Sequence, residues 1–399
     1  MDLRRTAAVV GVYEHPTRYA PDKSEALIIA ESIIGALQDA GLEKKDVDAL
    51  FVASTPPGIT GYGLCDYLNL YPRWVDTTNV GGASFEFHLS HAVTAIAAGR
   101  VRCAVIAYGS TARSSGVAVG TGGATRWGQT RLPPLPDSFE DIYGTTTVGL
   151  YAMIAQRHMY EYGTRPEQLA EIAVAMRYHA SMNPHAMYRD PITIEDVLNS
   201  RMVSSPLHLL DCCVISDGGG AVVVASPSLA RSARKKPVWV LGMGEAIAHQ
   251  GGGWRDLLEM AAAQSAPQAF GMAGVTHNDI DLCMIYDSFT ITVLLSLENL
   301  GFCRRGEGGA FVSGGRLRID GDLPTNTDGG GLSSNHPGMR GIFLIIEATR
   351  QLRGDYAGTP RQAHARRNRA EPPAIALCHG TGGALGTRHS GGTVILARD

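Results

Sequence analysis

The sequence predicts an α/β fold built from two similar halves, because two sets of segments recur along the chain. Gly41–Asp48 and Gly274–Asp281 share their glycine, apolar and aspartate positions, and an apolar stretch follows each of them. Gly220–Ala225 and Gly392–Ala397 are also similar, and both have the pattern of a short buried strand after a glycine turn. A duplicated strand–helix–strand unit accounts for both sets.

The elements around the first set of repeats follow one order in both halves. A helix-like stretch, Ser24–Ala40 or Asp256–Met272, ends at the repeated glycine, a residue that commonly terminates helices. An apolar strand then follows, Ala49–Ala53 in the first half and Leu282–Tyr286 in the second. A helix, a glycine stop and a buried strand therefore recur as one unit.

The first half also carries an insertion. The repeats of the first set are 233 residues apart and those of the second set are 172 apart, which puts about 61 additional residues in the first half. Residues 110–210 are the expected place, since the glycine- and proline-rich stretch Gly116–Pro136 interrupts the alternation of strands and helices. Two helix-like segments follow it, Thr146–Tyr162 and Arg165–Met182. Loops of this length commonly carry function, and an ordinary long loop without a ligand is the alternative.

The length of the chain indicates how many structural halves it forms, and its net charge indicates which class of partner it can bind. The chain has 399 residues, and single cores stop growing at roughly 250 residues, so we expect an N-terminal half, 1–233, and a C-terminal half, 234–399. The formal net charge of -3 provides no field that would hold a polyanion, so nucleic acid is not an expected partner. A small-molecule substrate fits this composition better.

Export, membrane insertion and metal binding are not expected of this chain. The first 30 residues lack the order of a secretion signal, and no apolar run approaches the roughly 18–20 residues that span a bilayer. The expected location is therefore cytoplasmic. The seven cysteines have no paired spacing, so we expect reduced thiols rather than disulfides or zinc ligands.

Five short motifs lie at the ends of predicted strands, and none of them is specific by itself. In chain order they are Asn79–Ser84 before a small-residue helix, Asp211–Cys213 leading to Ser216–Gly220, Tyr286–Phe289, Asn335–Gly338 and Cys378–Gly380. Together with the duplicated halves they resemble the thiolase superfamily, especially its sterol-carrier-protein-like and lipid-transfer-protein-like branch, over nearly the whole chain. The resemblance implies the thiolase fold: two βαβαβαββ halves in a five-layered αβαβα arrangement, with an inserted loop region in the first half.

The motif that carries the nucleophile of thiolases lacks its cysteine here. In thiolases the loop before the helix holds a cysteine that accepts the acyl group, because a thiolate at a helix N-terminus is a strong nucleophile. Alignment of the following helix places Gly82 at that position, with Ser84 close by. Ser84 could act as a nucleophile, but a serine here is more typical of a cap for the helix Phe85–Ala98. We therefore expect Gly82 and Ser84 to position the substrate or its oxyanion.

The motif Tyr286-Asp287-Ser288-Phe289 corresponds to His-Asp-Cys-Phe in sterol-carrier-type thiolases. The family's histidine helps to hold the thioester oxygen, and a tyrosine hydroxyl can donate the same hydrogen bond or, with a depressed pKa, shuttle a proton. The resemblance extends to steroid side-chain aldolases, which use a tyrosine for acid–base work. It implies a catalytic Tyr286, with Asp287 and Ser288 in positioning roles. The alternative is that Tyr286 ends a core strand with its hydroxyl satisfied.

His336 and Cys378 match two further catalytic positions of the family. The Gly-His-Pro histidine activates the nucleophile and polarises the thioester carbonyl, and His336 matches it, although Asn335 replaces the glycine. The Cys-x-Gly cysteine moves the proton at the carbon that leaves or attacks, and Cys378 matches it, followed by Gly380 as an oxyanion or substrate-positioning residue. The alternatives are a helix cap for His336 and inert packing for Cys378.

Three functions are compatible with these residues. Tyr286, His336 and Cys378 form an acid–base and oxyanion set, which favours retro-aldol cleavage of a β-hydroxyacyl thioester of coenzyme A. The second hypothesis is a thiolase, or acetyl-CoA acyltransferase, that cleaves a β-ketoacyl-CoA through Cys378 or by direct attack of CoA. The third is a non-catalytic acyl-CoA-binding subunit of a thiolase complex. The identity of the acyl group and the residues that contact CoA stay open.

The resemblance also implies partners. Thiolase-fold proteins pair through a central strand of the first half, so a homodimer is expected. Members of this branch often work with a small subunit that carries an OB fold and a zinc ribbon, and any zinc would belong to that subunit because this chain has no four-ligand pattern. Steroid aldolases of the branch carry a tyrosine near the position of His336. This chain lacks it, which weakens a steroid assignment.

Overall fold

The computed structural model describes residues 2–54, 61–116, 146–249, 256–366, 368–385 and 388–399. The elements of the first half are β1 (Ala8–Glu14), α1 (Glu25–Ala40), η1 (Lys44–Asp46), β2 (Ala49–Val52), α2 (Gly61–Leu68), β3 (Trp74–Asp76), α3 (Ser84–Ala97), β4 (Cys103–Ser110), β7 (Gly218–Ala225) and α8 (Pro227–Ser232). Between β4 and β7 the insertion contains α5 (Thr147–Tyr162), α6 (Pro166–Met182), α7 (Ile194–Asn199), β5 (Met202–Ser204), β6 (Leu207–His208) and η2 (Leu209–Asp211).

The second half repeats the order of strands and helices. Its elements are β8 (Val238–His249), α9 (Ala262–Ala273), η3 (His277–Asp279), β9 (Leu282–Ile285), α10 (Thr290–Asn299), α11 (Gly308–Val312), the π-helical turn η4 (Gly330–Ser334), α12 (Gly341–Arg353), β10 (Ile375–Ala384) and β11 (Arg388–Ala397). The predicted division at residue 233 falls between α8 and β8.

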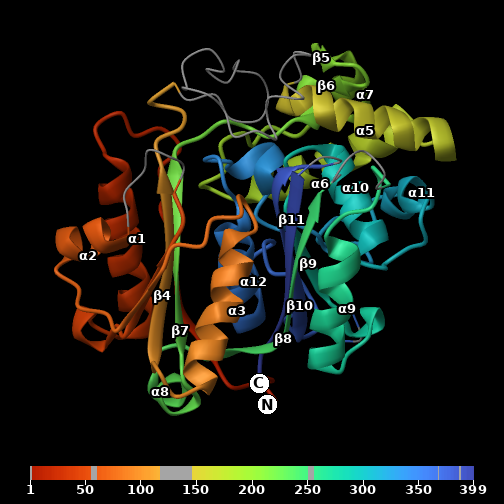
Figure 1. Cartoon of the computed structure of the whole chain (residues 1–399). Coiled ribbons are helices and arrows are strands. Elements are labelled where there is room, and N and C mark those ends of the chain that lie inside the picture. The colour runs from red at the N-terminus through yellow and green to blue at the C-terminus, as the bar shows by residue number, and fades with distance from the viewer. Residues whose placement is uncertain (1, 55–60, 117–145, 250–255, 367, 386–387) are drawn as a thin grey trace.

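Nine of the described strands form one mixed sheet in the order β3-β2-β4-β7-β1-β8-β11-β10-β9, and β5 and β6 form a separate two-stranded sheet. The sheet has one part from each half, and the two parts join where β1 pairs with β8 through Ala8–Trp239 and Val9–Val238. Helices α3 and α12 lie between the two parts, while α1 covers the outer face of the first part and α9 that of the second (Figure 1). The predicted five-layered αβαβα arrangement is confirmed.

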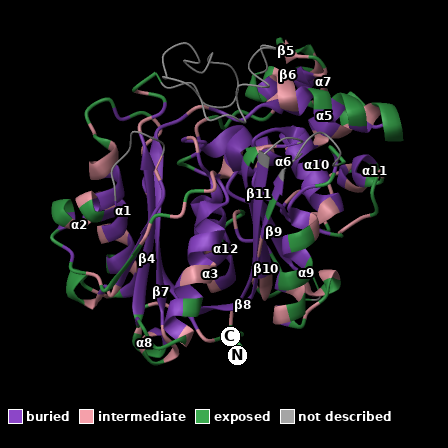
Figure 2. Cartoon of the chain, viewed as in Figure 1, coloured by how far each residue is buried: buried purple, intermediate pink, exposed green. Residues whose placement is uncertain are grey.

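Both faces of β2, β4, β7 and β9 are buried, and Figure 2 shows the interior of the sheet as buried. In β2 the side chains of Leu50 and Val52 pack in the outer core with α1, whereas Ala49 and Phe51 pack in the inner core with α3. Successive strand side chains point to opposite faces, so a strand between two helical layers must be apolar at every position. This explains why the repeated strands are uninterrupted apolar runs.

The predicted repeat is confirmed in detail. Both α1 and α9 end at a glycine in the left-handed region, Gly41 with φ 73° and Gly274 with φ 63°. A 3-10 turn and a buried strand follow in each half. The copies differ at the sheet edge, where the counterpart of β3 is reduced to an isolated parallel bridge between Cys283 and Thr325.

The insertion lies at the upper end of the sheet, where α5, α6 and α7 cover the second half (Figure 1). Both predicted helices are present, with Thr146 and Arg165 as the residues before α5 and α6. The glycine- and proline-rich stretch lies outside the described residues from 117 onward. The insertion therefore covers the strand ends at which the motifs were found.

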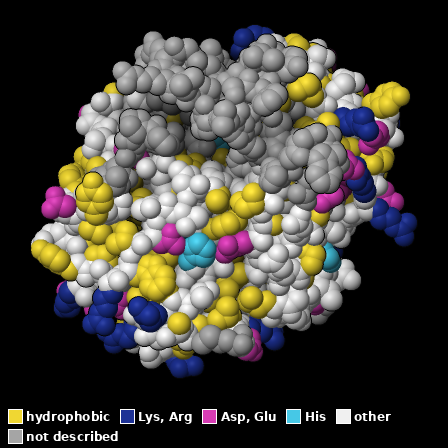
Figure 3. Space-filling view, in the orientation of Figure 1, with side chains coloured by type: hydrophobic (Ala, Val, Ile, Leu, Met, Phe, Trp, Pro, Cys, Tyr) yellow, Lys and Arg dark blue, Asp and Glu magenta, His cyan; other side chains and the backbone are white. Residues whose placement is uncertain are grey.

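The surface shows charges of both signs. On the face in Figure 3, basic side chains lie mainly near the margins and acidic side chains occur among them and nearer the centre. No continuous basic surface crosses the part of this face that the structure describes. Within the described chain, no helix combines the length and apolarity that a membrane crossing requires.

Candidate active site

A cavity of about 310 Å³ lies beyond the end of β9 and along the last residues of β10, beside the loop that leads into α3. Its described walls include Gly82, Tyr286, Ser288, His336, Met339 and Gly382. Gly82, Tyr286, Ser288 and His336 come from three of the five motifs, and Cys213, which also lines the cavity, comes from a fourth. The fold therefore brings the predicted site residues Gly82, Tyr286, Ser288 and His336 to one cavity.

Tyr286 follows β9 directly, and its backbone N–H donates to the His379 carbonyl of β10 at 2.9 Å. The side chain is 5% exposed and meets the His336 ring edge-on, with ring centroids 5.6 Å apart. The Tyr286 hydroxyl lies 2.9 Å from His336 Nε2 and 3.3 Å from the Gly338 carbonyl. The hydroxyl can donate to His336 Nε2, or it can accept from a protonated Nε2 while it donates to the Gly338 carbonyl. A proton can therefore pass between the two side chains.

The backbone around His336 is held on both sides. Its N–H donates to Ser216 Oγ at 3.0 Å, and the hydroxyl of Tyr108 donates to the next carbonyl, that of Pro337, at 2.6 Å. Ser216 belongs to the Ser-Asp-Gly-Gly-Gly motif of the first half. That motif therefore fixes the histidine of the second half.

Burial keeps both members of the pair neutral. Desolvation, with the Arg340 guanidinium as a smaller cause, lowers the pKa of His336 to about 3. Desolvation also raises the pKa of Tyr286 well above its ordinary value of 10. A depressed tyrosine pKa, one option considered from the sequence, is the opposite of what this environment produces. At neutral pH the pair is a neutral phenol beside a neutral imidazole, which suits concerted proton transfer.

Gly82 has no room for a side chain. A Cβ at this position would collide with the Tyr286 ring and with the Thr381 carbonyl. The preceding Gly81 has φ 73°, a conformation that favours glycine, and completes the tight turn into α3. The tyrosine ring thus occupies the space that a nucleophilic side chain at residue 82 would need.

Ser84 does not cap α3 as the sequence suggested. The helix begins at Ser84, its N-cap is Ala83, and no side-chain cap bond is formed. The Ser84 hydroxyl donates to the Gly81 carbonyl at 2.6 Å and accepts from Val80 N–H at 2.9 Å. Ala83 already has helical φ and ψ, so the serine lies one position too late to cap. It holds the turn before Gly82 instead.

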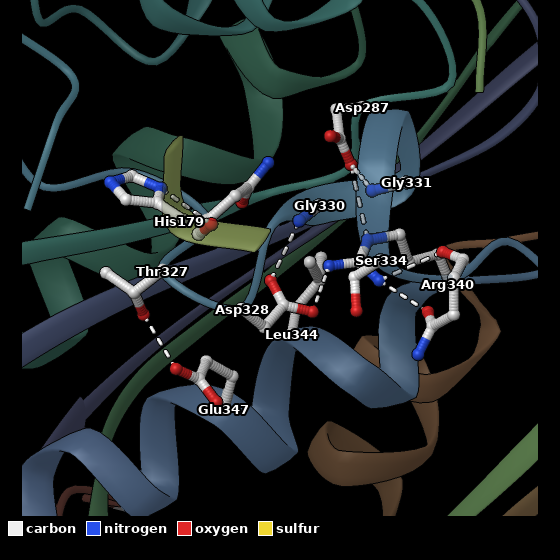
Figure 4. A network of polar contacts seen from close by, with 12 residues as sticks. His179, Asp287, Thr327, Asp328, Gly330, Gly331, Ser334, Arg340, Leu344 and Glu347 are labelled. Atoms are coloured by element: carbon white, nitrogen blue, oxygen red, sulfur yellow. Dashed lines mark hydrogen bonds and ion pairs between the residues drawn. The ribbon is translucent and has the colours of Figure 1, made fainter. Parts of the chain in front are cut away.

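Asp287 belongs to a buried network behind the cavity, shown in Figure 4. Arg340 is fully buried, its Nε lies 3.2 Å from Asp287 Oδ1, and its Nη2 lies 2.5 Å from Asp328 Oδ2. The Asp287 carboxylate also accepts from Gly331 N–H at 2.7 Å. Burial raises the pKa of Asp287 to about 6, although Arg340 opposes this shift. Asp287 does not line the cavity among the described residues and fixes the chain before His336.

Asn335, which stands in place of the family glycine, joins the same network. Its side-chain oxygen accepts from Arg340 Nη1 at 2.6 Å, and its amide donates to Glu14 Oε1 at 2.9 Å. Glu14 ends β1, so the loop that carries His336 is tied to the first half of the molecule. The substitution therefore adds an anchor for the histidine.

Cys378 and Gly380 belong to β10, which lines the cavity further along at Thr381, Gly382 and Gly383. The Cys378 thiol is fully buried and donates to the Leu344 carbonyl at 3.5 Å, and burial raises its pKa well above the ordinary value. A Cβ at Gly380 would collide with the carboxyl group of Glu86. Neither residue lines the cavity in the described part of the chain. Cys378 nevertheless packs in the same inner core as Tyr286, and its predicted role in proton transfer stays a prediction.

Two residues at the site were not predicted from the sequence. Glu86 on α3 is 1% exposed, neither of its carboxyl oxygens has a hydrogen-bond partner among the described residues, and burial raises its pKa well above the ordinary value. Cys213 lines the cavity, and burial raises the pKa of its thiol well above the ordinary value. A glutamate in an apolar helix was the available signal for Glu86. The pair Cys212-Cys213 was seen, but its spacing indicates no chemistry.

Comparisons with known proteins agree with the fold and the motifs. Residues 244–398 match the family model Thiolase C-terminal domain-like. The chain is 36% identical to an acetyl-CoA acetyltransferase of Methanothermobacter thermautotrophicus, covering 96% of this chain and 98% of that protein. It is also 36% identical to a steroid side-chain-cleaving aldolase of Thermomonospora curvata, covering 90% and 93%. The solved structure named Ltp2-ChsH2(DUF35) aldolase superposes with a TM-score of 0.85 at 31% identity, covering 100% and 99%. The chain belongs to the thiolase superfamily.

Proposed function

We propose that this chain cleaves β-hydroxyacyl-CoA thioesters by a retro-aldol reaction. The observation that carries the proposal is the hydrogen-bonded pair of Tyr286 and His336 in the cavity, with the tyrosine ring filling the space beside Gly82. A neutral phenol and a neutral imidazole can move a proton, whereas residue 82 offers no nucleophile. The named activity of the aldolase relative supports the same reaction class.

The proposed reaction conserves protons. Tyr286 Oη accepts the proton of the substrate β-hydroxyl while the phenol proton moves to His336 Nε2. The carbon–oxygen bond becomes a carbonyl, the bond between the α and β carbons breaks, and its electron pair enters the thioester as an enolate. The imidazolium at His336 balances the enolate charge, and the proton returns through Tyr286 to the α carbon. The products are an aldehyde or ketone and a shortened acyl-CoA.

Acyl transfer is the second candidate, because an acetyl-CoA acetyltransferase is as similar to this chain as the aldolase. In this reaction the thiolate of free CoA attacks the β-carbonyl of a β-ketoacyl-CoA, and the bond between the α and β carbons breaks. The α carbon leaves as an enolate and takes up a proton. Cys378 as acyl carrier is not favoured, since its buried thiol faces the Leu344 carbonyl.

Product analysis by mass spectrometry separates the two reactions. The protein is incubated with a β-hydroxyacyl-CoA or the matching β-ketoacyl-CoA, each with and without free CoA. We expect the hydroxy substrate to yield a carbonyl product and a shortened acyl-CoA without free CoA. If the protein cleaves the keto substrate but not the hydroxy substrate, and does so only when free CoA is present, the chain is a thiolase and the aldolase proposal is wrong. If neither substrate is cleaved, with or without a partner subunit, the remaining hypothesis is a non-catalytic subunit that binds acyl-CoA.

The assembly is also a proposal. We propose a homodimer formed along β3, one of the two edge strands of the described sheet rather than a central strand, because Trp74 and Val75 are 36% and 43% exposed there. We also propose a partner of the OB-fold and zinc-ribbon kind, supported by the solved structure named Ltp2-ChsH2(DUF35) aldolase. Light scattering of the purified chain should give twice the mass of one chain. A monomeric mass at micromolar concentration would refute the dimer.

A further inference from the structure

The insertion contributes a tyrosine to the catalytic cavity. Tyr151 lies in the second turn of α5, one turn after Thr147, and both residues line the cavity. The Tyr151 side chain is 3% exposed, and its ring packs against that of Phe289, with ring centroids 4.3 Å apart and planes inclined by 35°. This tyrosine is therefore held in a fixed position at the site, although it belongs to none of the five motifs.

The hydroxyl group of Tyr151 has two hydrogen-bond partners. Burial raises the pKa of Tyr151, and hydrogen bonds to the Ser288 side chain and to the Leu385 backbone oppose this shift. A backbone group that favours the phenolate must be a donor, so Leu385 contributes its N–H. The phenol oxygen thus accepts from Leu385, and the phenol proton can be donated to Ser288 Oγ.

The Ser288 hydroxyl is the last member of this chain of donors. Ser288 lines the catalytic cavity, and its Oγ lies 3.0 Å from Thr292 Oγ1. A hydroxyl group has one proton to donate and two lone pairs that accept. When Ser288 Oγ accepts from Tyr151, its own proton can be donated to Thr292 or to a ligand in the cavity. Successive hydrogen bonds in such a chain polarise one another, which strengthens the last donor.

The proposed reaction needs a donor of this kind. When the bond between the α and β carbons breaks, negative charge collects on the thioester oxygen, and a preformed donor at such an oxygen makes a large contribution to catalysis. The Tyr286 hydroxyl and His336 Nε2 are paired with each other for proton transfer. Ser288 follows Tyr286 by two residues and lines the same cavity. A base and a separate hydroxyl donor therefore reach the cavity from one short segment.

We propose that the Ser288 hydroxyl donates to the thioester oxygen as the enolate forms, and that Tyr151 is a positioning residue that orients and strengthens this donor. The inference rests on the proposed function, and the alternative acyl transfer passes through an enolate of the same kind. Because α5 belongs to the insertion, the insertion then takes part in the chemistry and does more than cover the strand ends.

Deuterium exchange at the α carbon of butyryl-CoA tests the inference without cleavage, because this thioester has no β-hydroxyl. In D2O the α proton moves to Tyr286 Oη while the phenol proton passes to His336 Nε2, the electron pair forms the enolate, and a deuteron returns to the carbon. Ser288→Ala should slow the exchange, followed by NMR, by about 10²–10³-fold, the range for a lost oxyanion donor. Tyr151→Phe keeps the ring and should slow it about tenfold, the effect of one hydrogen bond.

Cleavage of 3-hydroxybutyryl-CoA gives a second measure with the same variants. Both should lower kcat and leave KM within about twofold of wild type, because the bond to Ser288 strengthens only as the enolate charge develops. The double variant should be no slower than Ser288→Ala alone, since Tyr151 acts through Ser288. Tyr160→Phe is the matched control: Tyr160 lies on the same helix, is 83% exposed and is outside the cavity lining, so this variant should leave both rates unchanged.

The two measurements separate this inference from the proposed reaction. If wild-type protein does not cleave 3-hydroxybutyryl-CoA but its exchange of butyryl-CoA depends on both hydroxyls, the retro-aldol proposal fails and the inference stands. Exchange by Ser288→Ala and Tyr151→Phe at the wild-type rate would overturn the inference, as would a wild type that exchanges no deuterium. A double variant in which the two losses multiply would show that Tyr151 does not act through Ser288.

Discussion

Tyr286→Phe is expected to lower kcat for retro-aldol cleavage by about 10²–10⁴-fold, the range of a lost acid–base group. The phenylalanine ring retains the packing beside Gly82 and against His336, so the loss follows from the hydroxyl and not from a changed fold. His336→Ala should produce a loss of similar size, and the double variant should lose little more, because the two groups act as one unit.

Tyr356→Phe is the matched control for this prediction. The Tyr356 hydroxyl donates to Glu347 Oε2 at 2.7 Å, outside the cavity. This variant also loses a tyrosine hydrogen bond, so it should lower the free energy of unfolding slightly and leave kcat unchanged. A Tyr286→Phe protein with kcat within threefold of wild type would show that the tyrosine is a packing residue.

The pH profile gives a second measure of the same pair. The pKa of His336 is lowered to about 3, so the neutral imidazole persists throughout the range in which a free histidine protonates. The value of kcat/KM, which reports the free enzyme, should therefore show no loss near pH 6.5. A fall centred near 6.5 that disappears in His336→Ala would mean that the imidazole is exposed to water in solution.

Arg340→Met is expected to lower the free energy of unfolding by about 3–5 kcal/mol, because it leaves two buried carboxylates without their shared cation. Asp287 and Asp328 are both within 2% of full burial, so water cannot replace the guanidinium. Loss of the arginine should also loosen the loop that carries His336 and lower kcat. Denaturant unfolding of both proteins measures the effect.

The loss of stability in Arg340→Met should depend on pH. Without Arg340 the folded-state pKa of Asp287, already about 6, should rise further above the unfolded value. The folded variant then binds more protons than the unfolded chain, so its stability falls as pH rises and recovers as pH falls. The difference from wild type should thus shrink between pH 8 and pH 5.

Arg353→Met is the control for the buried arginine. Arg353 has a 1% exposed side chain and lies 2.8 Å from Asp39, whose side chain is 21% exposed. Water can reach this carboxylate, so the variant should lose only about 1 kcal/mol. If both variants lose the same free energy of unfolding, the buried network around Asp287 contributes no more to stability than the partly exposed Arg353–Asp39 pair.

The fold could be predicted from the sequence because its signals are local. Apolar runs, glycine stops and repeated spacing are properties of short segments, and both Gly41 and Gly274 end helices as expected. The failure at Ser84 is local as well, since one residue of backbone helix before it decides whether the hydroxyl can cap. Helix ends depend on such details, which the residue type does not determine.

The sequence could predict which residues form the site, but not how their side chains are arranged. Motif order indicated Tyr286 and His336, and the structure brings them together. The sequence could not show that Cys378 points to the Leu344 carbonyl, or that Glu86 fills the space left by Gly380. Both depend on how α3, α12 and β10 pack. Arg340 was missed for the same reason, since a single arginine in a loop gives no sign of burial.

The collision between the Tyr286 ring and any side chain at residue 82 has a consequence for the history of this protein. A side chain at residue 82 would meet both the tyrosine ring and the backbone carbonyl of Thr381, so it fits only if both move. One substitution at residue 82 therefore cannot restore a nucleophile in the present backbone. The glycine and the tyrosine together protect the site against single-step reversion.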